Sequence, residues 1–353
     1  MTRGAFGIAL AVAALIGCDR VVDRMIAHNL GRSDRTVLTS PDLTVVLCGT
    51  GSPLPDRARA GACTAVVAGG ELVLVDVGPG AWETVDLANL PTGDLSAILL
   101  THFHSDHIGD LGEAVTQSWV AGRVRPLDVY GPVGTANVVA GFGLAYAQDV
   151  EYRVAHHGEA SLPRAAGSAV AHEVPLDDDA LASAIVFERN GLRVTMFRVD
   201  HRPAVPAVGY RFDYRGRSVV ISGDTKKSAS VARHAAGADL LIHEALQPRV
   251  MARVAAVAAR LGRPRLAKLA ADTVSYHTTP VEAAEVARDA GVRHLVLTHL
   301  VPAPGNVLTR RLFADGMADV FAGEITLGVD GMRFTLPPAE PRTDPARTTS
   351  PRG

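Results

Sequence analysis

Residues 95–107 read LSAILLTHFHSDH, an apolar run followed directly by three histidines and an aspartate. The apolar run has the length and composition of a buried strand, so the polar cluster begins where that strand should reach the surface. Successive side chains of a strand point to opposite faces, which places His102 and His104 on the same side. Asp106 and His107 then open a segment that we expect to be helical over residues 109–120. Imidazole and carboxylate groups suit zinc and similar divalent ions, so the stretch predicts a metal site.

The pattern His-x-His-x-Asp-His at residues 102–107 resembles the signature of the metallo-β-lactamase superfamily. The resemblance implies an α/β fold, an αββα sandwich in which two mixed β-sheets are flanked by helices. Strand patterns that alternate with helical ones, such as residues 81–90 and 133–147, also indicate layers of helix and sheet. The resemblance covers most of the chain from Leu43 to Leu300 and is closest to the superfamily's phosphodiesterase-like branch.

At 353 residues the chain exceeds the usual size for one core, but α/β sandwiches of this length can form a single domain, and nearly half of the residues are apolar. With the resemblance, we expect one hydrolase domain over residues 42–336. Within it, residues 148–180 carry seven acidic side chains against two arginines, which we interpret as an irregular acidic insertion or lid. His156 and His157 lie in that stretch, and we expect them in a loop without an assigned role. Residues 337–353 are rich in Pro, Arg and Thr and are expected to form a disordered tail.

The N-terminus predicts export. Arg3 precedes an apolar run over residues 5–16 that ends just before Cys18, the pattern of a bacterial lipoprotein signal peptide over residues 1–18. Lipidated Cys18 would then anchor a periplasmic protein through a tether at residues 19–41, with Asp19 favouring the inner membrane. The alternatives are an uncleaved membrane anchor and a cytosolic protein with an apolar helix. The two other cysteines, Cys48 and Cys63, are expected to be buried free thiols, although the periplasm permits a disulfide.

The remaining ligands follow from the resemblance, because His201, Asp224 and His299 match later motifs of the phosphodiesterase-like branch. One metal would take His102, His104 and His201, and the other would take Asp106, His107 and His299, with Asp224 bridging both. We therefore expect two Zn²⁺ ions, with Mn²⁺ or Fe²⁺ as alternatives, and a metal-bridging hydroxide as nucleophile. Taken singly, each of the three later residues would more often be a structural polar group.

Three further residues complete the predicted site. Asp76 ends a strand and is expected to fix the tautomer of a histidine ligand, with a turn cap as the alternative. His277 resembles the family's histidine near the leaving group, so we expect a general acid there, with a surface cap before the helix at residues 280–290 as the alternative. Glu244 would orient His277, while Asp106 would also orient the hydroxide. His243, on the same predicted strand as Glu244, is expected to be a core histidine.

The resemblance to this branch implies a metal-dependent hydrolase of sulfate or phosphate esters, of arylsulfatase-like or phosphodiesterase type, acting on a small molecule. A ribonuclease Z-type tRNA 3′-endonuclease is the first alternative, but three features disfavour it. Residues after His299 read LVPAP and depart from the ribonuclease Z pattern, residues 148–180 have the wrong charge for a phosphate backbone, and tRNA precursors are cytosolic. A nucleic-acid partner is therefore not expected. A lactonase and a non-catalytic binding lipoprotein remain alternative functions. Asp224 disfavours a β-lactamase that acts on antibiotics. The sequence leaves open whether the protein forms a homodimer.

Overall fold

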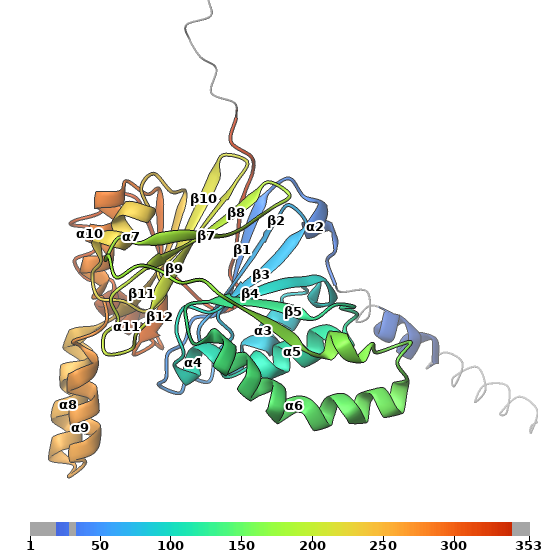
Figure 1. Ribbon diagram of the computed structural model, residues 1–353. Helices are drawn as coiled ribbons and strands as arrows, with labels where there is room; N and C mark the ends of the chain where they lie inside the picture. The colour runs from blue at the N-terminus through green and yellow to red at the C-terminus, as the bar shows by residue number, and fades with distance from the viewer. Residues whose placement is uncertain (1–18, 28–32, 341–353) are drawn as a thin grey trace, which may run out of the picture.

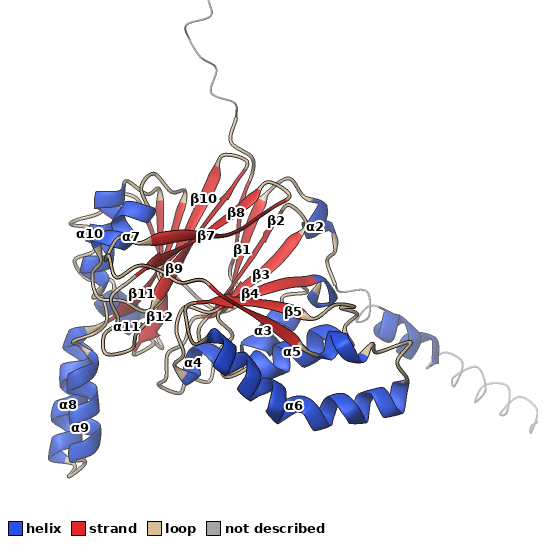
Figure 2. Ribbon diagram, viewed as in Figure 1, coloured by secondary structure: helices blue, strands red, loops and turns tan. Residues whose placement is uncertain are grey.

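Two seven-stranded sheets pack face to face in the computed structural model, which describes residues 19–27 and 33–340 (Figures 1 and 2). The first sheet has the order β14 (Arg333–Leu336), β1 (Leu43–Gly49), β2 (Cys63–Ala68), β3 (Glu71–Val75), β4 (Leu95–Leu99), β5 (Leu127–Gly131) and β6 (Ala169–Glu173). The second has the order β13 (Glu324–Leu327), β12 (His294–Val301), β11 (Leu240–Leu246), β10 (Arg217–Ile221), β9 (Val208–Tyr214), β8 (Leu192–Arg198) and β7 (Ser183–Arg189). Both sheets combine parallel and antiparallel pairs.

Helices cover the outer face of each sheet. The first sheet packs against α3 (Ala81–Leu87), α5 (Leu111–Val120) and α6 (Thr135–His157), and the second against α7 (Ala229–His234), α10 (Pro280–Ala290) and α11 (Val307–Phe313). Two short helices, α2 (Thr36–Thr39) and α4 (Ser105–Ile108), lie at the edge of the body and beside β4 respectively. The predicted αββα sandwich is confirmed.

Strand β1 shows why the sequence builds this arrangement. Val45 and Leu47 face the core between the sheets, whereas Val46 and Cys48 face the layer of helices. All seven residues of β1 are buried, so the strand is apolar on both faces rather than alternating. At roughly 25 cal/mol for each Å² of apolar surface buried, such double-sided strands supply much of the drive for folding.

Cys48 and Cys63 form a disulfide, so the expectation of two free thiols is wrong. The antiparallel pairing of β1 with β2 sets Gly49 opposite Cys63, with a register shift between Leu47 and Gly49. This register brings the Cα atoms of the two cysteines to 4.9 Å, well within the usual range for a disulfide. The pairing depends on the register of two strands, which local sequence patterns do not reveal.

Residues 148–180 are also more regular than expected. Their first part is the end of α6, which carries His156 and His157 in its last turn rather than in a loop. Their later part contains β6, which pairs in parallel with β5 and forms the edge of the first sheet. The expectation of an irregular stretch is wrong because these residues contribute a helix end and an edge strand.

The structure also bears on the predictions for the two ends of the chain and for the segment after β11. Residues 19–27 are helical, while Cys18, the rest of the predicted signal and residues 341–353 of the predicted tail lie outside the described residues. None of the helices in the described ranges combines the length and apolarity needed to cross a membrane. Helices α8 (Pro248–Arg260) and α9 (Pro264–Thr273) form an arm that projects from the body, which we did not predict (Figure 1).

Candidate metal centre

The predicted metal-binding motif lies where β4 ends. His102 follows the strand, and Asp106 and His107 lie in α4, whose first turn begins after His104. The imidazole of His102 is buried, whereas His104 is exposed and marks the open side of the cluster. The side chains of His102 and His104 approach each other, with Nε2 of the first 2.8 Å from Nδ1 of the second. The strand end and the helix start therefore hold the motif in a compact arrangement.

Asp76 lies beneath this motif and ties it to β3. Its carboxylate accepts hydrogen bonds from the backbone N–H of Thr101 at 2.8 Å and from the Thr101 hydroxyl at 2.7 Å. The same carboxylate lies 2.7 Å from Nδ1 of His107, which leaves Nε2 of that ring directed to the cluster. Such a carboxylate fixes the tautomer and orientation of a metal-binding imidazole. This is the position and contact that the sequence predicted for Asp76.

Three ends of strands in the second sheet bring the other predicted ligands. His201 follows β8, Asp224 follows β10 and His299 lies within β12. Gly223, just before Asp224, has a φ of 60°, and a Cβ there would lie 2.6 Å from the carbonyl oxygen of Val208. His299 has a φ of 45° and lies where the register between β11 and β12 shifts. Both backbones adopt conformations that few side chains favour, and both turn the chain towards the cluster.

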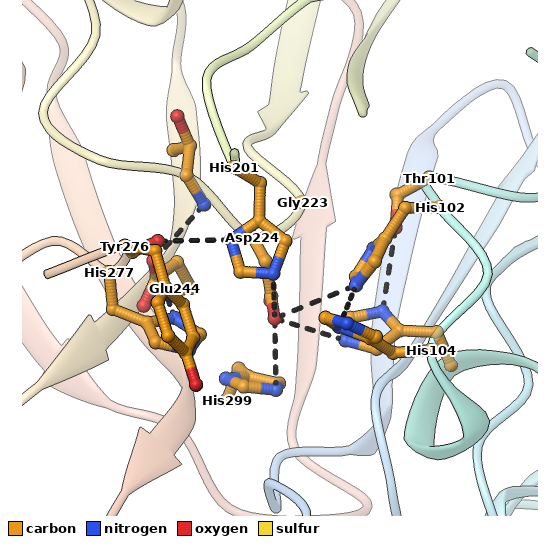
Figure 3. A network of polar contacts seen from close by, with 12 residues as sticks. Thr101, His102, His104, His201, Gly223, Asp224, Glu244, Tyr276, His277 and His299 are labelled. Atoms are coloured by element: carbon orange, nitrogen blue, oxygen red, sulfur yellow. Dashed lines mark hydrogen bonds and ion pairs between the residues drawn. The ribbon is translucent and has the colours of Figure 1, made fainter. Parts of the chain in front are cut away.

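All seven predicted ligands come together at this point. Figure 3 shows His102, His104, His201 and His299 around the carboxylate of Asp224. The carboxylate of Asp224 lies in the middle, with one oxygen 3.3 Å from Nε2 of His107 and 3.4 Å from Nε2 of His299. The same oxygen lies 3.8 Å from Nε2 of His201 and 3.9 Å from Nε2 of His102. Asp224 therefore faces both predicted sets of ligands, as a bridging carboxylate must.

The chemistry of the donors fits divalent metal ions. The groups with metal-ligating atoms within 4.8 Å of one another include His102, His104, His201 and Asp224, and separately Asp106, His107 and His299. Within the described chain, Nε2 of His107, Nε2 of His201 and Oδ1 of Asp224 are buried without a hydrogen-bond partner. Buried polar atoms without partners are costly, and a metal ion would satisfy them. The cluster can hold metal ions in the two predicted sets.

Electrostatics also favour this role. Burial lowers the pKa of His102 well below its usual value, which keeps the imidazole neutral as metal binding requires. Burial alone would raise the pKa of Asp224, but the nearby His299 and His107 outweigh it and hold that pKa well below the usual range. The site therefore presents a neutral imidazole on one side and a charged carboxylate at its centre.

His277 and Glu244 lie next to the cluster. Nδ1 of His277 lies 3.0 Å from Oε1 of Glu244, and the same oxygen accepts hydrogen bonds from the backbone N–H groups of Thr225 and Thr278 at 3.1 Å. Burial disfavours protonation of His277, but Glu244 and Asp224 outweigh burial and raise its pKa to about 9. The raised pKa favours the protonated form of His277, the state that a general acid needs.

One contact at the site escaped the sequence analysis. Nδ1 of His201 donates to the backbone carbonyl of Tyr276 at 2.9 Å, and the Tyr276 ring packs against the rings of His201 and His277. The sequence contains one signal for Tyr276, which is that it directly precedes His277. The contact itself uses the backbone carbonyl, which every residue type has, so the residue type cannot predict it. His243 is fully buried with Nδ1 2.8 Å from the carbonyl oxygen of Glu244, as a core histidine would be.

The model of the beta-lactamase superfamily domain matches residues 72–300. The chain belongs to the beta-lactamase superfamily. Within this superfamily it is 36% identical over 301 residues to a ribonuclease Z of Mycobacterium bovis, covering 84% of this chain and 99% of the relative. It is 38% identical over 293 residues to a ribonuclease Z of Mycolicibacterium paratuberculosis, covering 82% of this chain and 96% of the relative. These relatives favour the ribonuclease Z alternative over the arylsulfatase-like interpretation.

Solved structures of the superfamily share the fold. Human tRNase Z, short form, superposes with a TM-score of 0.59 at 24% identity, covering 83% of this chain and 99% of that one. A diphosphatase from the PhnP family gives 0.54 at 20% identity, covering 84% of this chain and 98% of that one. At these identities the likeness concerns the fold alone. The family membership and the histidine and aspartate cluster together make this chain a metal-dependent hydrolase.

Proposed function

We propose that this protein is a ribonuclease Z-type endonuclease that cleaves a phosphodiester at the 3′ side of precursor tRNA. The observation that carries the proposal is the similarity to proteins named ribonuclease Z over nearly their whole length, together with the seven converging ligands. When bound, two divalent ions would neutralise charge on the phosphodiester and lower the pKa of an attacking water. His102, His104 and His201 would hold one ion, Asp106, His107 and His299 the other, and Asp224 both.

The other residues of the site have distinct tasks. His277, whose raised pKa favours the protonated form, donates its proton to the departing ribose oxygen. Glu244 accepts from Nδ1 of His277, which keeps that ring oriented and charged. Asp106 has one carboxylate oxygen 3.1 Å from Nε2 of His299, so its second oxygen is available to orient the attacking water. Removal of His277 or Glu244 leaves the predicted ligand set intact and should affect turnover first, whereas removal of Asp106 also takes away a predicted ligand.

A second candidate is an exported phosphodiesterase that acts on small esters. The disulfide between Cys48 and Cys63 favours it, since disulfides persist mainly in oxidising compartments. The lipoprotein pattern ending at Cys18 points to the same place, and with it we propose a periplasmic protein tethered by a lipid anchor. The two candidates share the metal chemistry and differ in substrate.

One comparison of substrates separates the candidates. The zinc-loaded protein would be offered a 3′-extended tRNA precursor and bis(p-nitrophenyl) phosphate, with Asp224→Ala as the control for metal-dependent turnover. We expect efficient cleavage of the precursor that the control lacks. Cleavage of the small diester alone would favour the exported phosphodiesterase, and no cleavage of either substrate would contradict both.

A further inference from the structure

Tyr276 is the one aromatic side chain other than histidine, among the described residues, whose ring packs against that of a predicted ligand. Its ring centroid lies 5.4 Å from that of His201, edge to face, and 4.9 Å from that of His277 (Figure 3). The side chain is half-buried, so part of it is open to solvent. Tyr276 therefore lies between a predicted ligand and the proposed general acid, with an aromatic surface that a substrate can reach.

The two neighbouring histidines do not need this ring to be held in place. The imidazole of His201 is fixed through Nδ1, which donates to the backbone carbonyl of residue 276 at 2.9 Å, and every residue type has that carbonyl. His277 is held by the Glu244 carboxylate, 3.0 Å from its Nδ1. The Tyr276 hydroxyl donates to Oγ1 of Thr273 at 3.3 Å, outside the cluster of ligands. Both histidines thus keep their polar partners whatever side chain stands at position 276.

The position of His277 locates the nucleoside that departs. A ring nitrogen of His277 lies within 4.8 Å of metal-ligating atoms of Asp224 and His299, so an oxygen that it protonates lies at the metal centre. The ribose that carries this oxygen then lies against His277. Its base comes within reach of the adjacent Tyr276 ring, because the centroids of the two rings are only 4.9 Å apart.

Resting on the proposed function, we propose that the Tyr276 ring stacks on the base of the nucleotide that carries the departing ribose oxygen. Proteins that recognise RNA commonly hold unpaired bases on aromatic side chains, and such stacking accepts any base because every base has a π-face. A ring that already packs against two imidazoles is ordered before the substrate arrives, so its binding loses little conformational entropy. Tyr276 thus holds the departing nucleoside beside His277.

The test is a double-mutant cycle between the Tyr276 ring and the base. Four zinc-loaded full chains are compared: the wild type, Tyr276→Leu, Tyr276→Phe and, as a matched control, Tyr152→Leu, which changes an exposed tyrosine on α6. Each is given a 3′-extended tRNA precursor that is either intact or abasic at the nucleotide on one side or the other of the cut. The nucleotide that carried the departing oxygen is the one that ends in a free ribose hydroxyl after the cut.

Single-turnover kinetics with protein in excess give the half-saturating protein concentration, K1/2, and the maximal rate. If the wild type leaves the precursor uncut, fluorescence anisotropy gives the Kd for the same RNAs. Elemental analysis and Tm report whether the metal centre and the fold are intact.

With the intact precursor, Tyr276→Leu should raise K1/2 by about 5- to 100-fold, the range for loss of one stacked base, with a much smaller change in the maximal rate. Tyr276→Phe and Tyr152→Leu should match the wild type, and all four forms should hold the same amount of zinc. Removal of the base should weaken the wild type by a similar factor. Tyr276→Leu should add no further loss on that abasic precursor, because the base that the ring would hold is already absent.

Equal losses for Tyr276→Leu on the intact and both abasic precursors would overturn the proposal. So would a loss in Tyr276→Phe as large as that in Tyr276→Leu, because the hydroxyl would then be the group that matters. A higher KM of Tyr276→Leu for bis(p-nitrophenyl) phosphate, with unchanged binding of the precursor, would overturn it in favour of an aryl group of a small ester. A precursor that binds through Tyr276 but is not cut would count against the proposed function and leave the stacking in place. A precursor that the wild type and Tyr276→Leu cut with the same K1/2 would do the reverse.

Discussion

At the scale of single residues, His277 and Glu244 are expected to act on the leaving group, whereas the predicted ligands hold the metal ions. The pKa of about 9 at His277 depends on the buried Glu244 carboxylate, 3.0 Å from Nδ1. A general acid matters most when the leaving group is a poor one, as a ribose oxygen is, and least for p-nitrophenolate. The two substrates therefore report different parts of the site.

His277→Ala should slow cleavage of precursor tRNA by about 10²- to 10⁴-fold, the usual range for loss of general acid catalysis. Hydrolysis of bis(p-nitrophenyl) phosphate should fall far less, because its leaving group needs no proton. Steady-state kcat for the two substrates checks this, with the exposed His156→Ala as the matched histidine control. Equal losses on both substrates would show that His277 serves the metal centre rather than the leaving group.

The residues of the metal centre differ in how far the sequence alone predicts them. The cluster from His102 to His107 was predictable because four donors lie close together in the chain, directly after an apolar strand. His201, Asp224 and His299 come from three separate strand ends, and only resemblance to a family identified them. Their convergence depends on long-range pairing from β8 to β12, which no local pattern encodes. The contact between His201 and the carbonyl of Tyr276 could not be predicted from the sequence, because any residue has a backbone carbonyl.

At the scale of elements, strands and helices with clear periodicity were predicted well. The helix expected at residues 280–290 matches α10, whose start is fixed by a capping box between Thr279 and Glu282. The arm was missed because it depends on how two exposed helices pair beyond the end of β11, outside the core. The disulfide was missed because it depends on the register of β1 and β2.

Removal of the disulfide tests that register. Cys48→Ala with Cys63→Ala should lower the free energy of unfolding by about 2–4 kcal/mol, since the bond closes a loop of 15 residues in the unfolded chain. Urea unfolding under non-reducing conditions measures the loss in a form that starts at residue 19 and so lacks Cys18. Thiol titration of the same unfolded form should find no free thiol in the parent protein, and two reactive thiols would contradict the pairing.

At the scale of the whole molecule, the metal centre joins the two sheets. His102, His104, Asp106 and His107 follow a strand of the first sheet, whereas His201, Asp224 and His299 come from the second. Ions bound between them would stabilise the sandwich as well as supply chemistry, because a ligand that binds only the folded state favours it.

Chelation should therefore destabilise the protein as well as stop turnover. At a free metal concentration one hundred times Kd, each site contributes about 2.7 kcal/mol, so a chelator should lower Tm by several degrees. Elemental analysis should find about two ions in each chain and fewer in Asp224→Ala. An unchanged Tm after chelation, or a wild type with less than one ion in each chain, would contradict a metal centre that bridges the sheets.

The most direct measurement of the central claim is single-turnover cleavage of a 3′-extended tRNA precursor by the zinc-loaded protein, with the product ends mapped. We predict a single cut that separates the tRNA from its 3′ trailer, abolished by chelation and by Asp224→Ala. Cuts scattered along the RNA, or the same cut made by Asp224→Ala, would contradict an RNA-processing metal centre built on these residues.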